Sequence, residues 1–131
     1  MQEQRSDFGF AKPLRLLNAA EYRAVFSGTQ VRAAHPSLLI LAVHNDLGHP
    51  RLGLVIAKKH VRNAADRNRI KRIARETFRL RQHSLPAIDA VVIARPGIGD
   101  MDKAILAKLF DKQWRKLARR VQEQKEGARK R

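Results

Sequence analysis

The chain has 131 residues, a length that fits one domain with a poorly packed end or two. Its 28 lysines and arginines against 12 aspartates and glutamates give a formal net charge of +16. So large a charge repels itself in a compact fold and favours a polyanionic partner, with nucleic acid the first candidate and an anionic membrane surface the alternative. Hydrophobic residues make up 44% of the chain, which is enough for a core and excludes a wholly disordered protein.

The sequence contains no cysteine, which excludes disulfide bridges, thiolate nucleophiles and cysteine-based zinc sites and fits a reducing compartment. It also lacks an apolar run of about 18 residues, the length that a membrane-spanning helix requires. The first residues do not have the apolar stretch of a signal peptide. We therefore expect a cytoplasmic protein without a membrane partner.

The first predicted element is a short helix that begins after Asn18. Asn18 and Glu21 have the spacing of a capping box, in which each side chain accepts a hydrogen bond from a free backbone N–H. Gly28 is placed to end this helix in a left-handed conformation. The apolar positions that share one face of the helix are Tyr22, Val25 and Phe26.

Three apolar runs predict buried strands. The first spans residues 37–43 and the second residues 51–58, and the loop between them is short enough for an antiparallel hairpin. The third spans residues 88–94 and is rich in Val and Ile. A turn at Pro96 and Gly97 follows it.

Two longer helices are predicted from apolar residues at helical spacing. One begins after Asn63 as N-cap and ends before Pro86. Its apolar positions are Ile70, Ile73, Ala74, Thr77 and Phe78. The other opens near Asp100 or Asp102, either of which would cap it. Its apolar positions are Ile105, Leu106, Leu109, Phe110, Trp114 and Leu117.

The element order is helix, strands, helix, strand, helix, which predicts an α+β sandwich of sheet and helices. Residues 122–131 are polar and mostly basic, and we expect them to form a disordered tail. Residues 1–121 would then form a single domain, because no repeat or linker divides them.

The positive charge is concentrated between residues 58 and 81, where only Asp66 and Glu76 oppose it. On a helical wheel, a row of polar residues lies opposite the apolar face, at about 5 to 6 Å spacing that suits the phosphates of a nucleic-acid strand. Arginine binds phosphate through paired hydrogen bonds. The alternative is a solvated face on which Arg72 and Glu76 form an exposed pair. The residues of the polar row are Asn68, Arg72, Arg75 and Arg79.

A second candidate surface is the first helix, where Tyr22 and Phe26 lie one turn apart near Lys12 and Arg15. Aromatic rings beside basic residues would suit a single strand, whose unstacked bases lie on such rings. From spacing alone, however, an aromatic pair of this kind is more often part of a core.

We find no residues arranged for catalysis or metal binding. The histidines are scattered without HExxH spacing, and Gly97 and Gly99 form only a fragment of a dinucleotide motif. The aspartates sit beside turns or helix starts, where capping explains them: Asp46, Asp66, Asp89, Asp100 and Asp102. We therefore expect no acid–base or nucleophilic catalysis from this chain.

Four motifs in one order carry a resemblance to a known family. They are GLVIAKK at residues 53–59, Arg62–Ala64, RNRIKR at residues 67–72 and RETF at residues 75–78. This signature strongly resembles the protein component of bacterial ribonuclease P. The match extends through residues 15–17, 49–51 and 91–95, so that it covers most of residues 8–120.

The resemblance implies an α-β-β-β-α-β-α fold with a left-handed βαβ crossover, although right-handed connections are the general rule. It implies an accessory subunit of an endonuclease that releases the mature 5′ end of tRNA. In this family the RNA subunit and its Mg²⁺ carry out hydrolysis, so we expect the protein to bind no cofactor and no small-molecule substrate. A structural or general RNA-binding protein, such as a ribosomal protein, is the alternative.

The family also implies roles for particular residues. Tyr22 and Phe26, with Lys12 and Arg15, would line a cleft for the single-stranded 5′ leader of precursor tRNA. Some members carry an aromatic on the strand that faces the leader, whereas this chain has LLIL at residues 38–41, so the resemblance does not extend to stacking on the sheet. The residues expected to contact the catalytic RNA and the precursor are Lys58, Lys59, Arg62, Asn63, Arg67, Asn68, Arg69, Lys71, Arg72 and Arg75.

Overall fold

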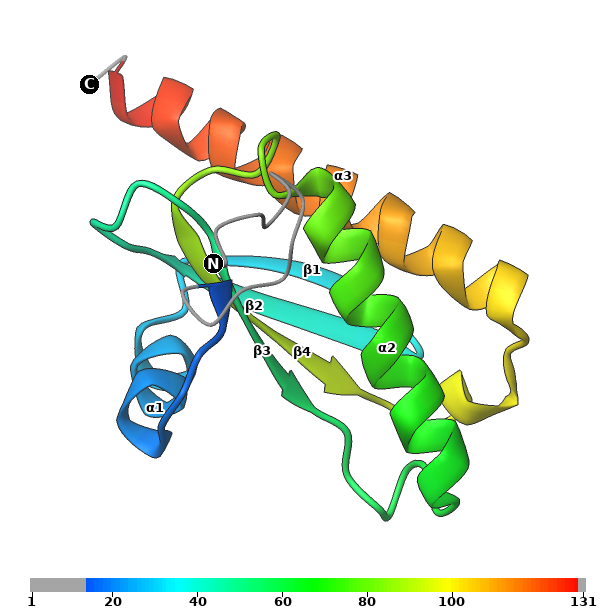
Figure 1. The fold of residues 1–131 in the computed structure, drawn as a ribbon. Helices are drawn as coiled ribbons and strands as arrows, with labels where there is room; N and C mark the ends of the chain where they lie inside the picture. The colour runs from blue at the N-terminus through cyan, green and yellow to red at the C-terminus, as the bar shows by residue number, and fades with distance from the viewer. Residues whose placement is uncertain (1–13, 130–131) are drawn as a thin grey trace, which may run out of the picture.

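The computed structural model describes residues 14–129 of the chain. Three α-helices, a four-stranded sheet and one 3-10 helix follow one another in this part of the chain (Figure 1). The elements in order are α1 (Ala19–Gly28), β1 (Val31–His35), β2 (Leu38–His44), β3 (Arg51–Val55), α2 (Ala64–Arg81), β4 (Ile88–Ala94), η2 (Ile98–Asp100) and α3 (Lys103–Arg129). The α+β class and the α-β-β-β-α-β-α order that we expected are thereby confirmed.

The sheet has the strand order β1-β2-β4-β3. β1 pairs antiparallel with β2, β2 pairs antiparallel with β4, and β4 pairs parallel with β3. The predicted hairpin between the runs at 37–43 and 51–58 is therefore wrong, because β4 lies between β2 and β3, and the hairpin partner of β2 is β1. α2 connects β3 to the parallel strand β4. With α2 in front of the sheet and the view turned so that both strands point upward, β4 lies to the left of β3, so the connection through α2 is a left-handed crossover (Figure 1).

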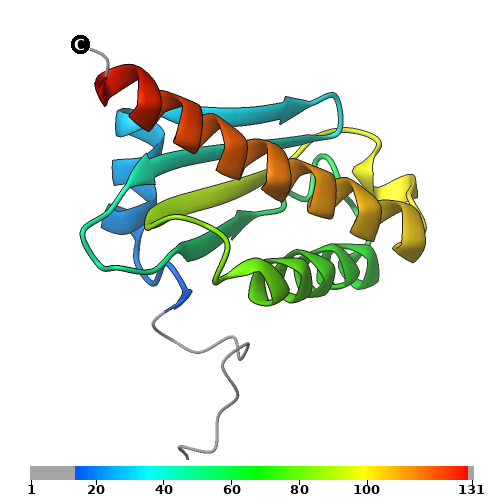
Figure 2. The same ribbon diagram turned by 90° about the horizontal axis from the view of Figure 1, so that it is seen from above.

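Helices cover both faces of the sheet (Figure 2). α2 and α3 lie on one face, where Trp114 packs edge-on against Phe78 at 5.4 Å between ring centroids and stacks on Phe110 at 6.3 Å. α1 lies on the other face, above a smaller cluster that contains Val25 and Leu41. The alternation of β2 side chains supplies both clusters, because successive residues of a strand point to opposite faces.

α1 begins as predicted but ends differently. The Asn18 side chain accepts a hydrogen bond from the Glu21 N–H at 2.9 Å, while the Glu21 carboxylate accepts one from the Leu17 N–H. Gly28 does not adopt a positive φ, so the left-handed ending that we expected is wrong. The Thr29 hydroxyl instead donates to the Val25 carbonyl at 2.7 Å, which satisfies a carbonyl that the last turn leaves open.

α3 is longer than the sequence predicted. Asp102 caps it by accepting a hydrogen bond from the Ile105 N–H at 2.9 Å, and Ile105 itself is 54% exposed instead of facing the core. The helix continues through Arg129, so residues 122–129 are helical where we expected a disordered tail. Val121 is buried at the expected boundary, and beyond it Gln124 donates to the Gln30 carbonyl, just before β1, at 3.1 Å.

Within residues 14–129, no helix combines the length and the apolar composition that a membrane span requires.

Candidate nucleic-acid interface

α2 buries one side in the core and presents its polar row on the other, as predicted. We call this row the basic face, and its residues are Asn68, Arg72, Arg75 and Arg79. The Asn63 side chain caps the helix by accepting a hydrogen bond from the Ala65 N–H at 2.8 Å. The buried residues of the helix are Ile70, Ile73, Ala74 and Phe78, and these pack into the main core. The sequence pattern thus fixes the rotation of the helix, and with it the direction in which the arginines point.

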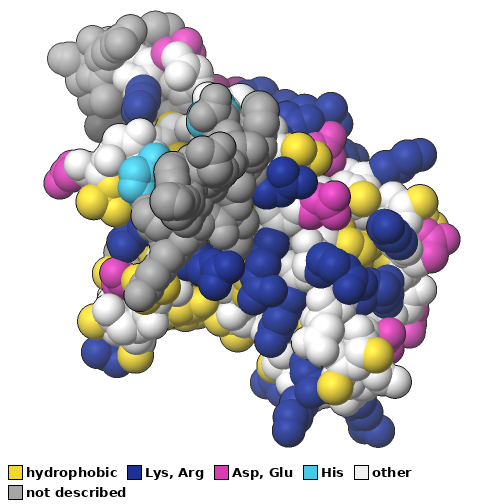
Figure 3. All heavy atoms as spheres, in the orientation of Figure 1, with side chains coloured by type: hydrophobic (Ala, Val, Ile, Leu, Met, Phe, Trp, Pro, Cys, Tyr) yellow, Lys and Arg dark blue, Asp and Glu magenta, His cyan; other side chains and the backbone are white. Residues whose placement is uncertain are grey.

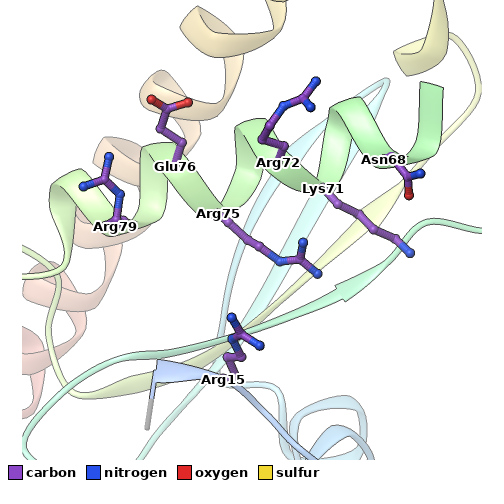
Figure 4. A pocket seen from close by; sticks show the side chains of 7 residues that line it. All are labelled: Arg15, Asn68, Lys71, Arg72, Arg75, Glu76 and Arg79. Carbon is purple, nitrogen blue, oxygen red and sulfur yellow. The ribbon is translucent and has the colours of Figure 1, made fainter. Parts of the chain in front are cut away.

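A hollow of about 540 Å³ lies beside the basic face. It is lined by Arg15, Asn68, Lys71, Arg72, Arg75, Glu76 and Arg79, so that five cations and one carboxylate border it. All of these residues except Arg15 come from α2, and the Arg15 and Arg75 side chains point toward one another across the hollow (Figure 4). Like charges held this close repel one another, which makes the hollow a favourable place for an anion.

Arg15 reaches this hollow because the segment before α1 pairs with the edge of the sheet. Arg15 forms an isolated parallel bridge with Leu52, and the Leu16 N–H donates to the Leu52 carbonyl at 3.0 Å. Leu14 and Leu16 are buried while Arg15 between them is exposed. This alternation turns the Arg15 side chain away from the core and toward α2.

The Arg72 and Arg75 guanidinium groups are exposed and are not held by acidic side chains. Within residues 14–129, neither makes an ion pair, and Glu76 forms none with Arg72 in spite of their i,i+4 spacing. The exposed Arg72–Glu76 pair that we weighed as the alternative is therefore not formed.

Unlike Arg72 and Arg75, Arg67 and Arg69 donate hydrogen bonds to backbone carbonyls of neighbouring segments. Arg67 donates to the Val61 and Arg62 carbonyls at 3.0 and 2.9 Å, which closes the loop before α2. Arg69 donates to the Met101 and Gly99 carbonyls at 2.6 and 3.1 Å and so binds η2 to α2. Both arginines are half-buried, and each keeps further N–H donors for a ligand.

The loop between β3 and α2 adds further positive charge. Lys58, Lys59 and Arg62 are exposed, whereas the Asn63 oxygen is already used as the helix cap. Lysine and arginine side chains gather over α2 and at its N-terminal end (Figure 3). The structure thus brings most of the predicted RNA-contacting residues to one side of the molecule.

A second hollow of about 130 Å³ adjoins the first and contains Tyr22. It shares Arg15, Lys71 and Arg75 with the first hollow. The Tyr22 hydroxyl accepts a hydrogen bond from the Leu54 N–H at 3.1 Å, which fixes the ring against β3. The ring also lies so close to Gly53 that an added Cβ there would come within 2.7 Å of it.

The other expected members of the leader cleft are placed differently. Phe26 is 45% exposed on α1, so it is not part of the core, and it lines neither of the two hollows. Lys12 lies outside the described residues. Val25 is the residue of α1 that is fully buried.

Arg51, Asp89 and Glu21 form an ionic cluster beside the first turn of α1, which we did not predict from the sequence. Asp89 lies in β4 and is buried, and it does not cap a turn as we expected. Arg51 binds both Asp89 oxygens at 2.9 and 2.7 Å and donates to Glu21 at 2.9 Å. The Leu17 N–H and, after it, Arg51 lower the pKa of Glu21. The signal in the sequence was an aspartate inside an otherwise apolar strand, because such a charge requires a partner.

Arg81 is also used inside the protein. It binds both carboxylate oxygens of Asp111 and so connects α2 to α3. This contact, together with the weaker one from Arg115, lowers the pKa of Asp111. Arg81 therefore belongs to the helix–helix contact and not to the basic face.

The donor set does not fit a metal ion held by the protein alone. Among the residues that the structure describes, no three histidine, aspartate or glutamate side chains lie close enough together to hold one. Glu76 is the one carboxylate among the residues that line the hollow, and the cations around it compete with a metal ion for its oxygens.

A family model described as Ribonuclease P matches residues 10–118. The chain belongs to the ribonuclease P protein family. Its relatives include the ribonuclease P protein components of Salmonella paratyphi A, 52% identical over 84% of this chain and 92% of the relative, and of Serratia proteamaculans, 51% identical over 86% and 93%. The resemblance that the motifs carried is thereby confirmed.

Solved ribonuclease P proteins share the fold. The Staphylococcus aureus protein superimposes with a TM-score of 0.68 at 29% identity, covering 72% of this chain and 86% of that one. The Thermotoga maritima protein gives 0.65 at 27% identity, covering 77% and 96%. The chain is accordingly the accessory protein subunit of the endoribonuclease ribonuclease P, with ribonuclease P RNA as its partner, and RNA binding and tRNA 5′ processing follow from the family.

Proposed function

We propose that the hollow beside α2 binds phosphate groups of RNA in the assembled ribonuclease P. The observation that carries this proposal is the set of five cations around one cavity, of which Arg72 and Arg75 make no ion pair within residues 14–129. A phosphate would relieve the repulsion among them and take paired hydrogen bonds from the guanidinium groups. Asn68 and Lys71 supply further donors on the same side of α2.

The loop and the first turn of α2 extend this contact. Lys58, Lys59 and Arg62 are exposed beside the helix N-terminus, which itself favours an anion. Arg67 and Arg69 bind RNA with the donors that their backbone contacts leave unused. Asn63 contributes mainly as the helix cap, since its side-chain oxygen is occupied.

The hollow around Tyr22 receives the single-stranded 5′ leader of precursor tRNA in this proposal. Tyr22 offers a half-buried ring beside Arg15 and Arg75, so that a base can stack while its phosphates reach the cations. Phe26 lies one turn further along α1 with much of its ring exposed, and it extends the stacking surface. Lys12 lies outside the described residues, and its place in this site stays an expectation from the family resemblance.

Hydrolysis belongs to the RNA subunit and its Mg²⁺. The protein has no carboxylate cluster among its described residues that would hold such an ion, and its cationic hollow suits phosphates of the substrate. The role of the protein is to bind and orient the precursor, in the cytoplasm, where tRNA is processed. Purified protein should therefore cleave no precursor unaided, and it should restore activity of the RNA subunit at low Mg²⁺.

Reconstitution with ribonuclease P RNA tests the leader site. We expect the holoenzyme to bind precursor tRNA more tightly than mature tRNA, and Tyr22→Ala to reduce this preference because about 1–3 kcal/mol of stacking per base is lost. Tyr22→Phe keeps the ring and serves as the matched control for the lost contact with the Leu54 N–H. Equal affinities of the wild-type holoenzyme for both tRNAs would refute leader binding and favour general RNA binding.

A further inference from the structure

The side chains of α3 fall into three rows with different surroundings. The row that faces the sheet is buried and consists of Leu106, Phe110, Trp114, Leu117 and Val121. A second row follows the free edge of the sheet and has a structural task. There, Lys116 donates to the Ala34 carbonyl at 3.2 Å and Arg120 donates to the Arg32 carbonyl at 2.7 Å. This row covers the edge of β1, which would otherwise offer unpaired backbone groups.

The third row points away from the protein and does not pack on the sheet or cover its edge. It consists of Lys108, Lys112, Arg115 and Arg119. Successive members are four, three and four residues apart, which places them on one side of the helix along about 16 Å of its length. All are exposed. In the described part of the chain, the one acidic contact of this row is the 4.0 Å pair between Arg115 and Asp111. We call this row the α3 strip.

The α3 strip has a sharp border. Asp111, the acidic residue beside it, is already bound by Arg81 through both oxygens. Beyond Arg119 the exposed positions on the same side of the helix change to Gln122, Glu123 and Glu126. A merely solvated face would mix the two signs along its whole length, whereas here four cations follow one another without an acidic member.

We propose that the α3 strip is a second RNA-contact surface, which binds the sugar–phosphate backbone of ribonuclease P RNA. The strip shares no residue with the hollow beside α2. It contains no aromatic side chain, so it offers charge and hydrogen bonds for phosphates and no platform for bases. The partner RNA is the polyanion that the family supplies, and four cations at about 5 to 6 Å spacing match consecutive phosphates of one strand.

Binding of ribonuclease P RNA at several salt concentrations tests this surface. The double variant Lys112→Gln/Arg119→Gln removes two charges from the strip and keeps good helix formers. Its matched control is Lys103→Gln/Lys125→Gln, which removes the same charge from exposed positions of α3 outside the strip. Equal thermal unfolding midpoints of the three proteins establish that the fold is intact.

We expect the strip variant to lower the slope of log affinity against log salt by up to about two units, and the control to leave it unchanged. Hydroxyl-radical footprinting of the RNA should show a protected segment that is lost in the strip variant and kept in Arg72→Gln/Arg75→Gln. Unchanged binding by the strip variant would overturn the proposal. Equal losses in strip and control variants would overturn it too, because they would show an effect of net charge alone.

Discussion

At the scale of single residues, Gly53 determines how closely Tyr22 approaches β3. A Cβ at this position would lie 2.7 Å from two ring carbons of Tyr22 and 2.9 Å from Leu16. Real Cβ atoms do not come so close to other carbons, so the ring would have to move. The hydrogen bond from the N–H of Leu54, the next residue of β3, to the Tyr22 hydroxyl holds the same ring in place. The position of Tyr22 in its hollow thus depends on a residue without a side chain.

Gly53→Ala should destabilise the protein by about 1–3 kcal/mol, because the added methyl group forces Tyr22 and Leu16 out of their positions. Urea unfolding measures the change. Gly127→Ala is the matched control: nothing lies within 4 Å of its added Cβ, and alanine favours the helix, so stability should stay equal or rise. A Gly53→Ala protein as stable as wild type would show that the ring has room to shift.

Glu21 should contribute stability that depends on pH. Its pKa in the folded protein lies below the ordinary value of 4.5, so its contribution is fully present above that pH and is lost as the pH falls through the folded pKa. We expect Glu21→Gln to lower the free energy of unfolding at pH 7, with the difference from wild type shrinking as the pH falls below 4.5. Urea unfolding across this range checks it, with Glu123→Gln as an exposed control. A difference that is constant with pH would contradict this role of the charge.

At the scale of secondary-structure elements, α2 joins stability to RNA binding because its two sides have separate tasks. Ile73→Asp should unfold the domain, since it buries a charge without a partner in the main core, at a cost above about 4 kcal/mol. Arg72→Asp introduces an aspartate at the neighbouring, exposed position of α2. This variant should keep the fold and weaken RNA binding. Circular dichroism and RNA titration distinguish the two variants. An Ile73→Asp protein that folds normally would show that the helix is rotated differently.

Most elements could be predicted because their local patterns agree with their final environment. Residues 88–94 form β4 with the expected bounds, and Asn63 caps α2 as expected. β1 has the sequence VRAAH, which contains only one large apolar residue, and its burial comes from α3, which packs on it from far along the chain. The pairing of β3 with β4 could not be seen locally either, since α2 lies between the two strands in the sequence.

The candidate site was predictable to the extent that it lies on one helix. The spacing of Asn68, Arg72 and Arg75 determines their common side, and the structure places them around one hollow. The opposing position of Arg15 depends on its bridge to Leu52, a contact between distant segments that spacing does not reveal. The same limit applies to the arginines that bind inside the protein, such as Arg51 and Arg81, which composition alone counts with the basic face.

At the scale of the whole molecule, the net charge of +16 is divided between structure and surface. Some cations hold elements together, as Arg69 holds η2 and Arg120 holds the edge of β1. A second group gathers around the hollow beside α2, at the loop before it and along the α3 strip. An accessory subunit that works by binding RNA requires this second group, whereas the first group holds elements of the fold together.

The most direct test of this account is the salt dependence with which ribonuclease P RNA binds the double variant Arg72→Ala/Arg75→Ala. We predict an unchanged unfolding midpoint and a slope of log affinity against log salt that falls by up to about two units relative to wild type. A slope equal to that of wild type would contradict the central claim that the exposed side of α2 binds RNA phosphates.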